Sequence, residues 1–305
     1  MRPTLLLLFG LLALSFRPDK PAYRLYDAKI KAVSYEQLLR RAADADVVLF
    51  GELHNNPICH WLELQLAKDL AEQKKGQLVL GAEMFETDNQ AALTDYVQGR
   101  SSDKEFAAQA RLWPNYDTDY KPLTTLARAQ KLPFVATNIP RRYATLVARN
   151  GLSSLDTVSA ATRRLIAPLP LTVDLTRPGY KAMMEMMGGS GHGSSGAPNP
   201  HGGTTDMAAN FARAQAIKDA TMAYFILQNR KPGQTLLHVN GDYHSKNFDG
   251  IVGYLRDMAG PSLKILTISS VDVPDPEKPK ADSETNLNQL ADFVLAIPSD
   301  MTKTY

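Results

Sequence analysis

The chain has 305 residues, of which 44% are hydrophobic and 22% are charged, a composition typical of a globular protein with a buried core. Its 34 basic and 32 acidic residues leave a formal net charge of +2. This near balance provides no extended positive field that would attract a polyanion, so it argues against nucleic acid as a partner.

A short apolar segment at the N-terminus has the pattern of an export signal. Arg2 precedes the apolar run Leu5–Phe16. A membrane-spanning helix needs about 20 apolar residues, so this run is too short to be one. Ala13 and Ser15 give the small-x-small pattern of a cleavage site. We therefore expect residues 1–15 to be a signal peptide and the mature protein to be periplasmic or secreted, in the cell envelope.

The first strand and helix are predicted between residues 45 and 76. The apolar run Val47–Phe50 has the length and β-branched content of a buried parallel strand. Asn56 and Pro57 are typical of the N-cap and first position of a helix, and Gly76 is typical of a helix end. The single cysteine, Cys59, falls in this helix, where we expect it to pack as a small hydrophobic residue.

The same strand-and-helix unit recurs along the chain. Further strands are predicted at 77–82, 133–137, 235–239 and 263–268, and further helices at 87–96, 126–131, 140–149, 207–229 and 251–258. Thr87 and Gln90 are spaced as in a capping box at the start of the second helix. Strands that alternate with helices predict an α/β fold, with a mostly parallel sheet and helices on both faces. We expect one such domain over residues 24–305.

One segment interrupts this pattern. The stretch Gly188–Asp206 is rich in glycine, serine and proline, and it follows a cluster of methionines between Met183 and Met187. Such a composition buries too little apolar surface to order itself. We interpret residues 172–206 as a lid insertion, partly helical and partly flexible.

Polar side chains follow the predicted strands at their carboxyl ends, where open parallel sheets bind ligands. Gly51 and His54 form a Gly-x-x-His motif after the first strand, and Gly241 and His244 form a second one. Glu83 ends the strand between them in sequence. Two histidines and a glutamate suit zinc or another divalent ion, so we predict His54, Glu83 and His244 as metal ligands.

Other polar residues near these motifs have two interpretations each. Glu52 and Asp242 are expected either to fix the imidazole tautomers or to act as a general base. An alternative interpretation is that such residues only cap helices and bind loops. His60 is expected on a helix surface or packed against a neighbour, and His238 inside a strand is expected to be a core residue.

Four tyrosines and two arginines are candidates for binding a cofactor. Phenolate suits ferric haem iron, and these residues are equally typical of aromatic anchors. The candidates are Tyr116, Tyr120, Tyr180 and Tyr243. Arg141 and Arg142 stand at a predicted helix start, where they would meet a carboxylate or phosphate, although such arginines more often pair with surface acids.

The predicted lid offers two further candidates. His192 and His201, with the methionines beside them, could supply imidazole or soft ligands to haem or copper, although methionines at helical spacing usually serve packing. Several other chemistries lack their motifs. The chain has no Gly-x-Ser-x-Gly, Gly-x-x-x-x-Gly-Lys, His-Glu-x-x-His or post-strand Gly-x-Gly-x-x-Gly pattern, which argues against serine hydrolases, nucleotide hydrolases and dinucleotide oxidoreductases.

Taken in order, five motifs resemble the ChaN-like haem-binding uptake family, which belongs with the Tiki metalloproteases and, more remotely, the erythromycin esterases. The resemblance covers roughly residues 30–270. Its motifs are Gly51–His54, Gly81–Phe85, Asn138–Arg142, Ala214–Ala223 and Gly241–His244.

The resemblance implies an α/β fold, a bacterial envelope location and, for ChaN-like members, haem bound between protomers with tyrosine as the iron ligand. For Tiki-like members it implies a catalytic divalent metal, which carries over to His54, Glu83 and His244. It assigns the haem tyrosine to no single position here. The chain also lacks the lipoprotein cysteine typical of the ChaN type.

We therefore expect an exported haem- or metal-binding protein that serves haem and iron acquisition. Haem, with a divalent metal as a second cofactor, a homodimer and an outer-membrane haem uptake system are the expected cofactors and partners. The alternative is a metal-dependent hydrolase, a protease or esterase, with His54, Glu83 and His244 as ligands and Glu52 as the general base.

Overall fold

The computed structural model describes residues 20–189, 204–279 and 286–305. Within these ranges the chain forms one eight-stranded sheet with the strand order β2-β1-β8-β7-β3-β6-β4-β5. The predicted signal peptide, and His192 and His201 of the predicted lid, lie outside the described residues.

Six strands of the sheet run parallel to one another, and two short strands add antiparallel pairs at one edge. The parallel strands are β3 (Val47–Glu52), β4 (Leu78–Glu86), β5 (Phe134–Asn138), β6 (Thr235–Gly241), β7 (Ile265–Val273) and β8 (Phe293–Pro298). The edge strands are β1 (Arg24–Asp27) and β2 (Ala32–Val33). The predicted parallel α/β sheet is thus confirmed, whereas β1, β2 and β8 were not predicted.

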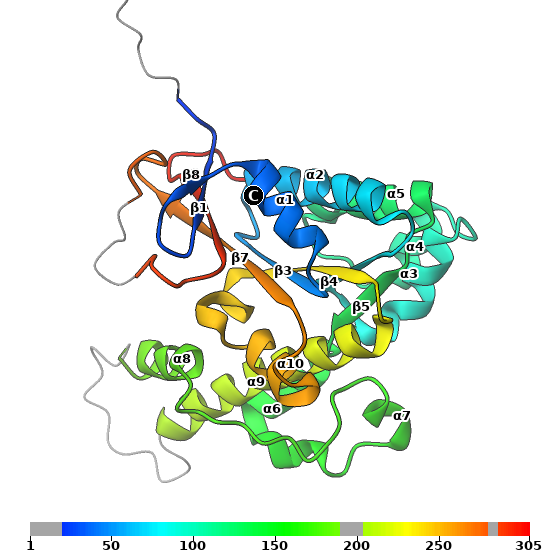
Figure 1. Ribbon diagram of the computed structural model, residues 1–305. Coiled ribbons are helices and arrows are strands. Elements are labelled where there is room, and N and C mark those ends of the chain that lie inside the picture. The colour runs from blue at the N-terminus through cyan, green and yellow to red at the C-terminus, as the bar shows by residue number, and fades with distance from the viewer. Residues whose placement is uncertain (1–19, 190–203, 280–285) are drawn as a thin grey trace, which may run out of the picture.

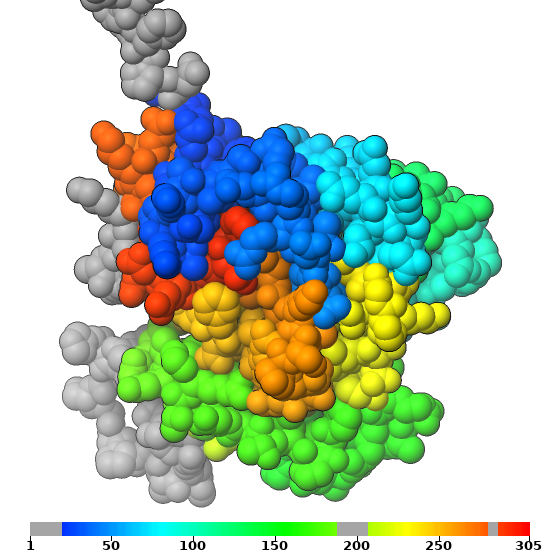
Figure 2. All heavy atoms as spheres, viewed as in Figure 1, coloured from blue at the N-terminus to red at the C-terminus, as the bar shows by residue number. Residues whose placement is uncertain are grey.

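Helices cover both faces of this sheet, as predicted (Figure 1). One layer consists of α1 (Tyr35–Ala43), α2 (Pro57–Lys74), α3 (Gln90–Val97), α4 (Asp103–Gln109) and α5 (Lys121–Gln130). The other consists of α6 (Arg141–Asn150), α7 (Ala160–Arg163), α8 (Pro178–Gly189), α9 (Thr204–Asn229) and α10 (Ile251–Ala259). In Figure 2 the two layers appear as bands of colour, blue and cyan above, green and orange below. No helix in the described ranges is long and apolar enough to cross a membrane.

Each central strand contributes to a hydrophobic core on both faces of the sheet. All six residues of β3 are buried. Val48 and Phe50 pack into the core under α2 and α5, whereas Val47 and Leu49 belong to the core under α9 and α10. This alternation follows from the two-residue period of a strand and explains why the predicted run was apolar without interruption. Burying each such side chain contributes about 1.5–3 kcal/mol.

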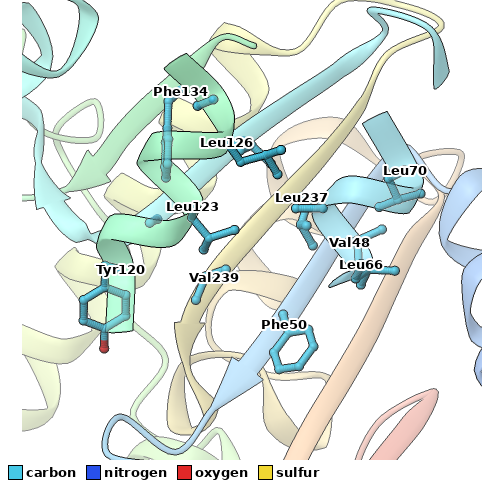
Figure 3. Close-up of a cluster of buried hydrophobic side chains, with 14 of the residues drawn as sticks. Val48, Phe50, Leu66, Leu70, Tyr120, Leu123, Leu126, Phe134, Leu237 and Val239 are labelled. Carbon is cyan, nitrogen blue, oxygen red and sulfur yellow. The ribbon is translucent and has the colours of Figure 1, made fainter. Parts of the chain in front are cut away.

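Figure 3 shows the first of these cores. Leu237 and Val239 of β6 lie beside Val48 and Phe50, opposite side chains of α2 and α5. Tyr120 lies at one end of this cluster, on the side toward which the arrowheads of β3 and β6 point. The hydrophobic core therefore stops at the carboxyl ends of β3 and β6, where the polar residues of the two Gly-x-x-His motifs follow.

The start of α2 forms as the sequence predicts. The Asn56 side chain accepts a hydrogen bond from the Ile58 amide at 3.0 Å, and Pro57 is the first helical residue. The helix ends at Lys74. Its C-cap, Lys75, adopts the left-handed conformation (φ 44°), and Gly76 (φ 87°) follows.

The predicted capping box before α3 is wrong. The Thr87 hydroxyl donates to the Leu165 carbonyl at 2.7 Å instead of capping the helix. Gln90 reaches the neighbouring strand β5, donating to the Phe134 carbonyl at 3.0 Å and accepting from the Ala136 amide at 2.7 Å. A 3₁₀ turn, Thr87–Asn89, therefore precedes α3. Contacts across the fold have replaced the local ones that the spacing suggested.

Candidate functional site

The ends of β3, β4 and β6 form one side of a pocket of about 430 Å³, which we call the strand-end pocket. It is lined by His54, Glu83, Glu86, Trp113, Pro114, Asn138, Ile139, Arg141, Lys218 and His244. The structure thus brings His54, Glu83 and His244 together, although their donor atoms do not all lie within 4.8 Å of one another. It also adds Trp113 and Lys218, which the sequence did not single out.

The two Gly-x-x-His motifs interlock through their glycines. A Cβ atom at Gly241 would lie 2.7 Å from the His54 Nε2 atom, and one at Gly51 would lie 2.7 Å from the Asp242 Oδ1 atom. Each glycine therefore makes room for a side chain of the other motif, because β3 and β6 are adjacent parallel strands. This is the physical reason for a glycine at the start of both motifs.

His54 is held by a buried carboxylate. Its Nδ1 lies 2.7 Å from the Glu52 Oε1 atom, and the Tyr120 hydroxyl donates to the same oxygen at 2.7 Å. Burial opposes the charged form of Glu52, but the bond to His54 and the nearby His60 ring outweigh it and lower its pKa to about 2. Burial likewise opposes the charged form of His54, but its bond to Glu52 raises its pKa overall. With Nδ1 directed at Glu52, the Nε2 atom is the one that remains for a ligand.

A second chain of contacts surrounds His244. Its Nε2 lies 3.2 Å from the Glu83 Oε1 atom, and its Nδ1 lies 2.5 Å from the Asp219 Oδ1 atom. The Gly241 amide donates to the other oxygen of Glu83 at 2.8 Å, and the Tyr180 hydroxyl donates to the other oxygen of Asp219 at 2.7 Å. Every ring nitrogen and carboxylate oxygen in this chain therefore has a partner.

These contacts decide the charge on His244. Burial alone would lower its pKa, but the carboxylates of Glu83 and Asp219 raise it to about 10. The same pairing keeps the pKa of Glu83 well below its usual range, despite burial. Because both nitrogens of a cationic His244 face carboxylates, binding a metal there requires the loss of a proton.

Asp219 is the partner that the sequence did not reveal. It lies on α9, within the Ala214–Ala223 motif, but nothing in the sequence pairs it with His244. Asp242, which was considered for such a role, instead accepts a hydrogen bond from the Ser269 hydroxyl at 2.5 Å.

Of the four candidate tyrosines, three are buried with their hydroxyls in use. The Tyr116 hydroxyl lies 2.8 Å from the Thr124 hydroxyl, Tyr120 bonds to Glu52, and Tyr180 bonds to Asp219. Burial raises the pKa of all three. Tyr243 is 38% exposed, and the Lys246 Nζ atom lies 4.0 Å from its ring centroid. Their service as iron ligands stays a prediction.

The two candidate arginines are placed differently. Arg141 lines the strand-end pocket. Arg142 is paired with Asp88 at 2.7 Å, and its guanidinium lies 4.6 Å from the Tyr143 ring centroid. Trp113, from the loop before the Tyr116–Tyr120 π-helical turn, packs edge-on against His54 with ring centroids 5.0 Å apart. The pocket therefore combines two imidazoles, two carboxylates, aromatic and aliphatic surface, and the cations of Arg141 and Lys218.

His238 fulfils the prediction of a core residue. It is fully buried, with Nε2 2.7 Å from the Thr137 hydroxyl and Nδ1 3.2 Å from the Asn240 Oδ1 atom. Burial lowers its pKa to about 4, so it is neutral near pH 7.

Comparisons with known proteins agree with this architecture. The structure of ChaN of Campylobacter jejuni, described as showing cofacial heme binding, superimposes with a TM-score of 0.65, 18% identity and coverage of 90% of this chain and 96% of that one. A mutant of the erythromycin esterase EreC in its open conformation gives a TM-score of 0.50 and 11% identity, over 91% of this chain and 97% of that one. At these identities the likeness is one of fold.

In sequence, no curated protein matches the chain. The family model described as "Haem-binding uptake, Tiki superfamily, ChaN" matches residues 38–255. This match spans most of the chain and includes both Gly-x-x-His motifs. The chain therefore belongs to the ChaN family of haem-binding uptake proteins within the Tiki superfamily.

Proposed function

We propose that this protein binds haem in the strand-end pocket and serves iron acquisition as an exported protein of the cell envelope. The family match and the heme binding of Campylobacter ChaN support the ligand class. The observation that carries the proposal for this chain is His54, a partly exposed imidazole at the pocket whose Nδ1 is held by Glu52.

The pocket residues suit the three chemical parts of haem. The Nε2 atom of His54 is a ligand for the iron, and a carboxylate behind the ring makes such an imidazole a stronger donor. Trp113 and Ile139 offer apolar contact to the ring system, while Arg141 and Lys218 offer cations to the propionates. Haem bound in this way would leave the hydrogen bond between Glu52 and the Nδ1 atom of His54 in place.

Tyr243 is the second candidate for the iron. Among the four predicted tyrosines it is the one with an exposed ring, since the other three direct their hydroxyls to buried partners. Haem held by residues as exposed as His54, at 38%, would keep one face in solvent. A second copy of the chain would cover that face, so a homodimer is part of the proposal, as is transfer to an outer-membrane haem uptake system.

The test is a titration of the purified chain with hemin, followed by absorbance. Replacing His54 with Ala is expected to weaken binding at least about tenfold, which corresponds to about 1.4 kcal/mol. Tyr243→Phe tests the phenolate in the same way. Trp61→Ala, which removes an exposed aromatic ring of α2, is the control for nonspecific adsorption. Absence of saturable hemin binding by the wild type, or equal affinity in the His54 and Tyr243 variants and the wild type, would contradict the proposal.

The second candidate function is metal-dependent hydrolysis, and one observation favours it: His54, Glu83 and His244 line the same pocket. Under this proposal they hold a divalent ion, and Glu52 would act as the base. Glu52 is 1% exposed and already accepts from Tyr120, so it is better placed to orient His54 than to meet a substrate. Cleavage of an ester or peptide that requires added metal and disappears in Glu83→Gln, in a protein without hemin affinity, would favour this function.

A further inference from the structure

A second group of ligand-type side chains lies behind the strand-end pocket. It consists of Glu52 from β3 and His60 and Glu63 from α2, and we call it the inner triad. Their exposed fractions are 1%, 6% and 0%. Each residue offers one donor atom within 4.8 Å of the others, and no other such group of histidines, cysteines and carboxylates occurs in the described part of the chain. Nothing in the proposed haem function uses His60 or Glu63.

The surroundings of His60 fix which nitrogen carries its proton. Its Nε2 atom faces the His54 carbonyl at 3.2 Å and the Asp119 Oδ2 atom at 3.5 Å, and both of these are acceptors. Nε2 therefore carries a proton, and Nδ1 is the nitrogen that faces the other two members of the inner triad. A ligating histidine usually donates its second nitrogen to a carbonyl or carboxylate in this way.

The atoms that face each other in the inner triad have no hydrogen-bond partners. His60 Nδ1 lies 3.3 Å from Glu52 Oε2 and 3.5 Å from Glu63 Oε2, yet none of these atoms makes a hydrogen bond within the described structure, and neither does the other oxygen of Glu63. Buried polar atoms are almost always paired, because an unpaired one costs several kcal/mol in the worst cases. Three ligand-type side chains that converge in the core without hydrogen bonds between them therefore form a candidate site for a cation.

Distance and charge both point to a divalent ion. Zinc holds nitrogen and oxygen ligands at about 2.0–2.2 Å, and a tetrahedron of that radius has edges of about 3.3–3.6 Å. The two separations at Nδ1, 3.3 and 3.5 Å, match those edges. Two carboxylates, a neutral imidazole and a divalent ion sum to zero charge. Without the ion, burial raises the pKa of Glu63 well above its usual range, so a proton on that carboxyl group takes the place of the second charge, and binding the ion would release it.

We propose that Glu52, His60 and Glu63 form a buried site for a divalent transition-metal ion, separate from the strand-end pocket. One nitrogen and two carboxylate oxygens are a donor set that suits zinc. Glu52 would join this ion to the pocket, because its Oε2 atom faces the inner triad while its Oε1 atom holds His54 and Tyr120. The ion would thereby orient His54 through a single carboxylate.

The test measures zinc bound by the full chain after chelation, reloading and desalting. We expect about one zinc per chain and a higher Tm in the zinc-loaded protein, because an ion that binds the folded state stabilises it. Glu63→Gln and His60→Gln are each expected to weaken zinc binding at least about a hundredfold. Glu72→Gln, an exposed position on the same helix, is the matched control and should bind zinc as the wild type does.

Two further measurements make the result decisive. Glu63→Asp keeps the charge but withdraws the carboxylate, so it should fold and still bind zinc less tightly. Co²⁺ in place of zinc should give the absorption bands of a four-coordinate site in the wild type and lose them in this variant. Failure of the wild type to take up zinc would overturn the proposal. So would zinc that stays in Glu63→Gln and Glu63→Asp but leaves His244→Ala, because that ion would lie in the strand-end pocket.

Discussion

His54 occupies the space that a side chain at Gly241 would need. A Cβ atom at position 241 would lie 2.7 Å from the Nε2 atom and 2.8 Å from the Cε1 atom of this imidazole. The ring in turn reaches back to Glu52 through Nδ1. The position of His54 is thus set from two sides, by a carboxylate at the end of the preceding strand, β3, and by the glycine backbone of the neighbouring strand, β6.

Gly241→Ala should therefore displace His54 without adding or removing any polar group. Overpacking of this kind costs about 1–3 kcal/mol, and loss of the bond to Glu52 should weaken hemin binding about tenfold or more. Urea unfolding and hemin titration measure the two effects. Gly81→Ala is the control, because the nearest atom to its Cβ would be the His238 Cδ2 at 3.1 Å, an atom of a core residue and not of His54. Unchanged hemin affinity in Gly241→Ala would show that the position of His54 is not critical.

Tyr120→Phe should destabilise the protein more than Tyr116→Phe does. Both tyrosines are buried in the same π-helical turn, but Tyr120 donates to the ionised Glu52, whereas Tyr116 meets the Thr124 hydroxyl. Hydrogen bonds to charged groups contribute about 1.5–3 kcal/mol, and neutral ones about 0.5–1.5 kcal/mol. Urea denaturation of the two variants gives the comparison. Equal losses of stability would argue that Glu52 is not charged in the folded protein.

Stability should fall as the pH drops from about 6.5 to about 4, in part because of His238. Burial lowers the pKa of this residue from 6.5 to about 4, so the unfolded chain binds a proton in this window that the folded chain does not. The contribution is fully present above pH 6.5 and is lost as the pH falls through the window, by up to about 3 kcal/mol. The free energy of unfolding, measured at several pH values, should depend less steeply on pH in His238→Gln. Parallel curves for the two proteins would refute this assignment.

Arg141→Ala and Arg142→Ala should differ in their affinity for hemin. Arg141 lines the strand-end pocket, whereas Arg142 is bound to Asp88 and stacked on Tyr143. We expect the first variant to bind hemin about three- to tenfold more weakly and the second to bind it normally, since an exposed salt bridge contributes only about 0–1 kcal/mol. The opposite order would place the propionates on the Asp88 side of α6.

The fold was predictable where the signal was local and repeated. Continuous apolar runs identified β3, β4, β5, β6 and β7, because strands buried on both faces need no polar residues. The four-residue β1 and two-residue β2 carry too short a pattern to stand out. The capping box predicted from Thr87 and Gln90 was wrong, because both side chains form hydrogen bonds with distant segments instead of with the local backbone.

The candidate site was predictable only where strand ends converge. His54, Glu83 and His244 could be grouped because parallel strands end at one edge of a sheet. Asp219 and His60 sit on helices, and which way a helical residue faces depends on packing that no local spacing reveals. His60 is buried because Asp119, from a distant segment, and the backbone of His54 close over it.

The central place of β6 has a consequence for how the protein is made. β3 and β4 belong to the first third of the chain, yet the strand that lies between them, Thr235–Gly241, is synthesised in the last third. Until β6 is synthesised, β3 and β4 each lack a hydrogen-bonded neighbour on the side that β6 will occupy. Such unpaired edges favour slow folding and aggregation. A chain that ends before Thr235 would lack β6, which pairs with both β3 and β4. It would also lack Gly241, the residue whose backbone packs against His54. Ligand binding would then report that synthesis has passed His244, since a product that ends before it lacks part of the pocket.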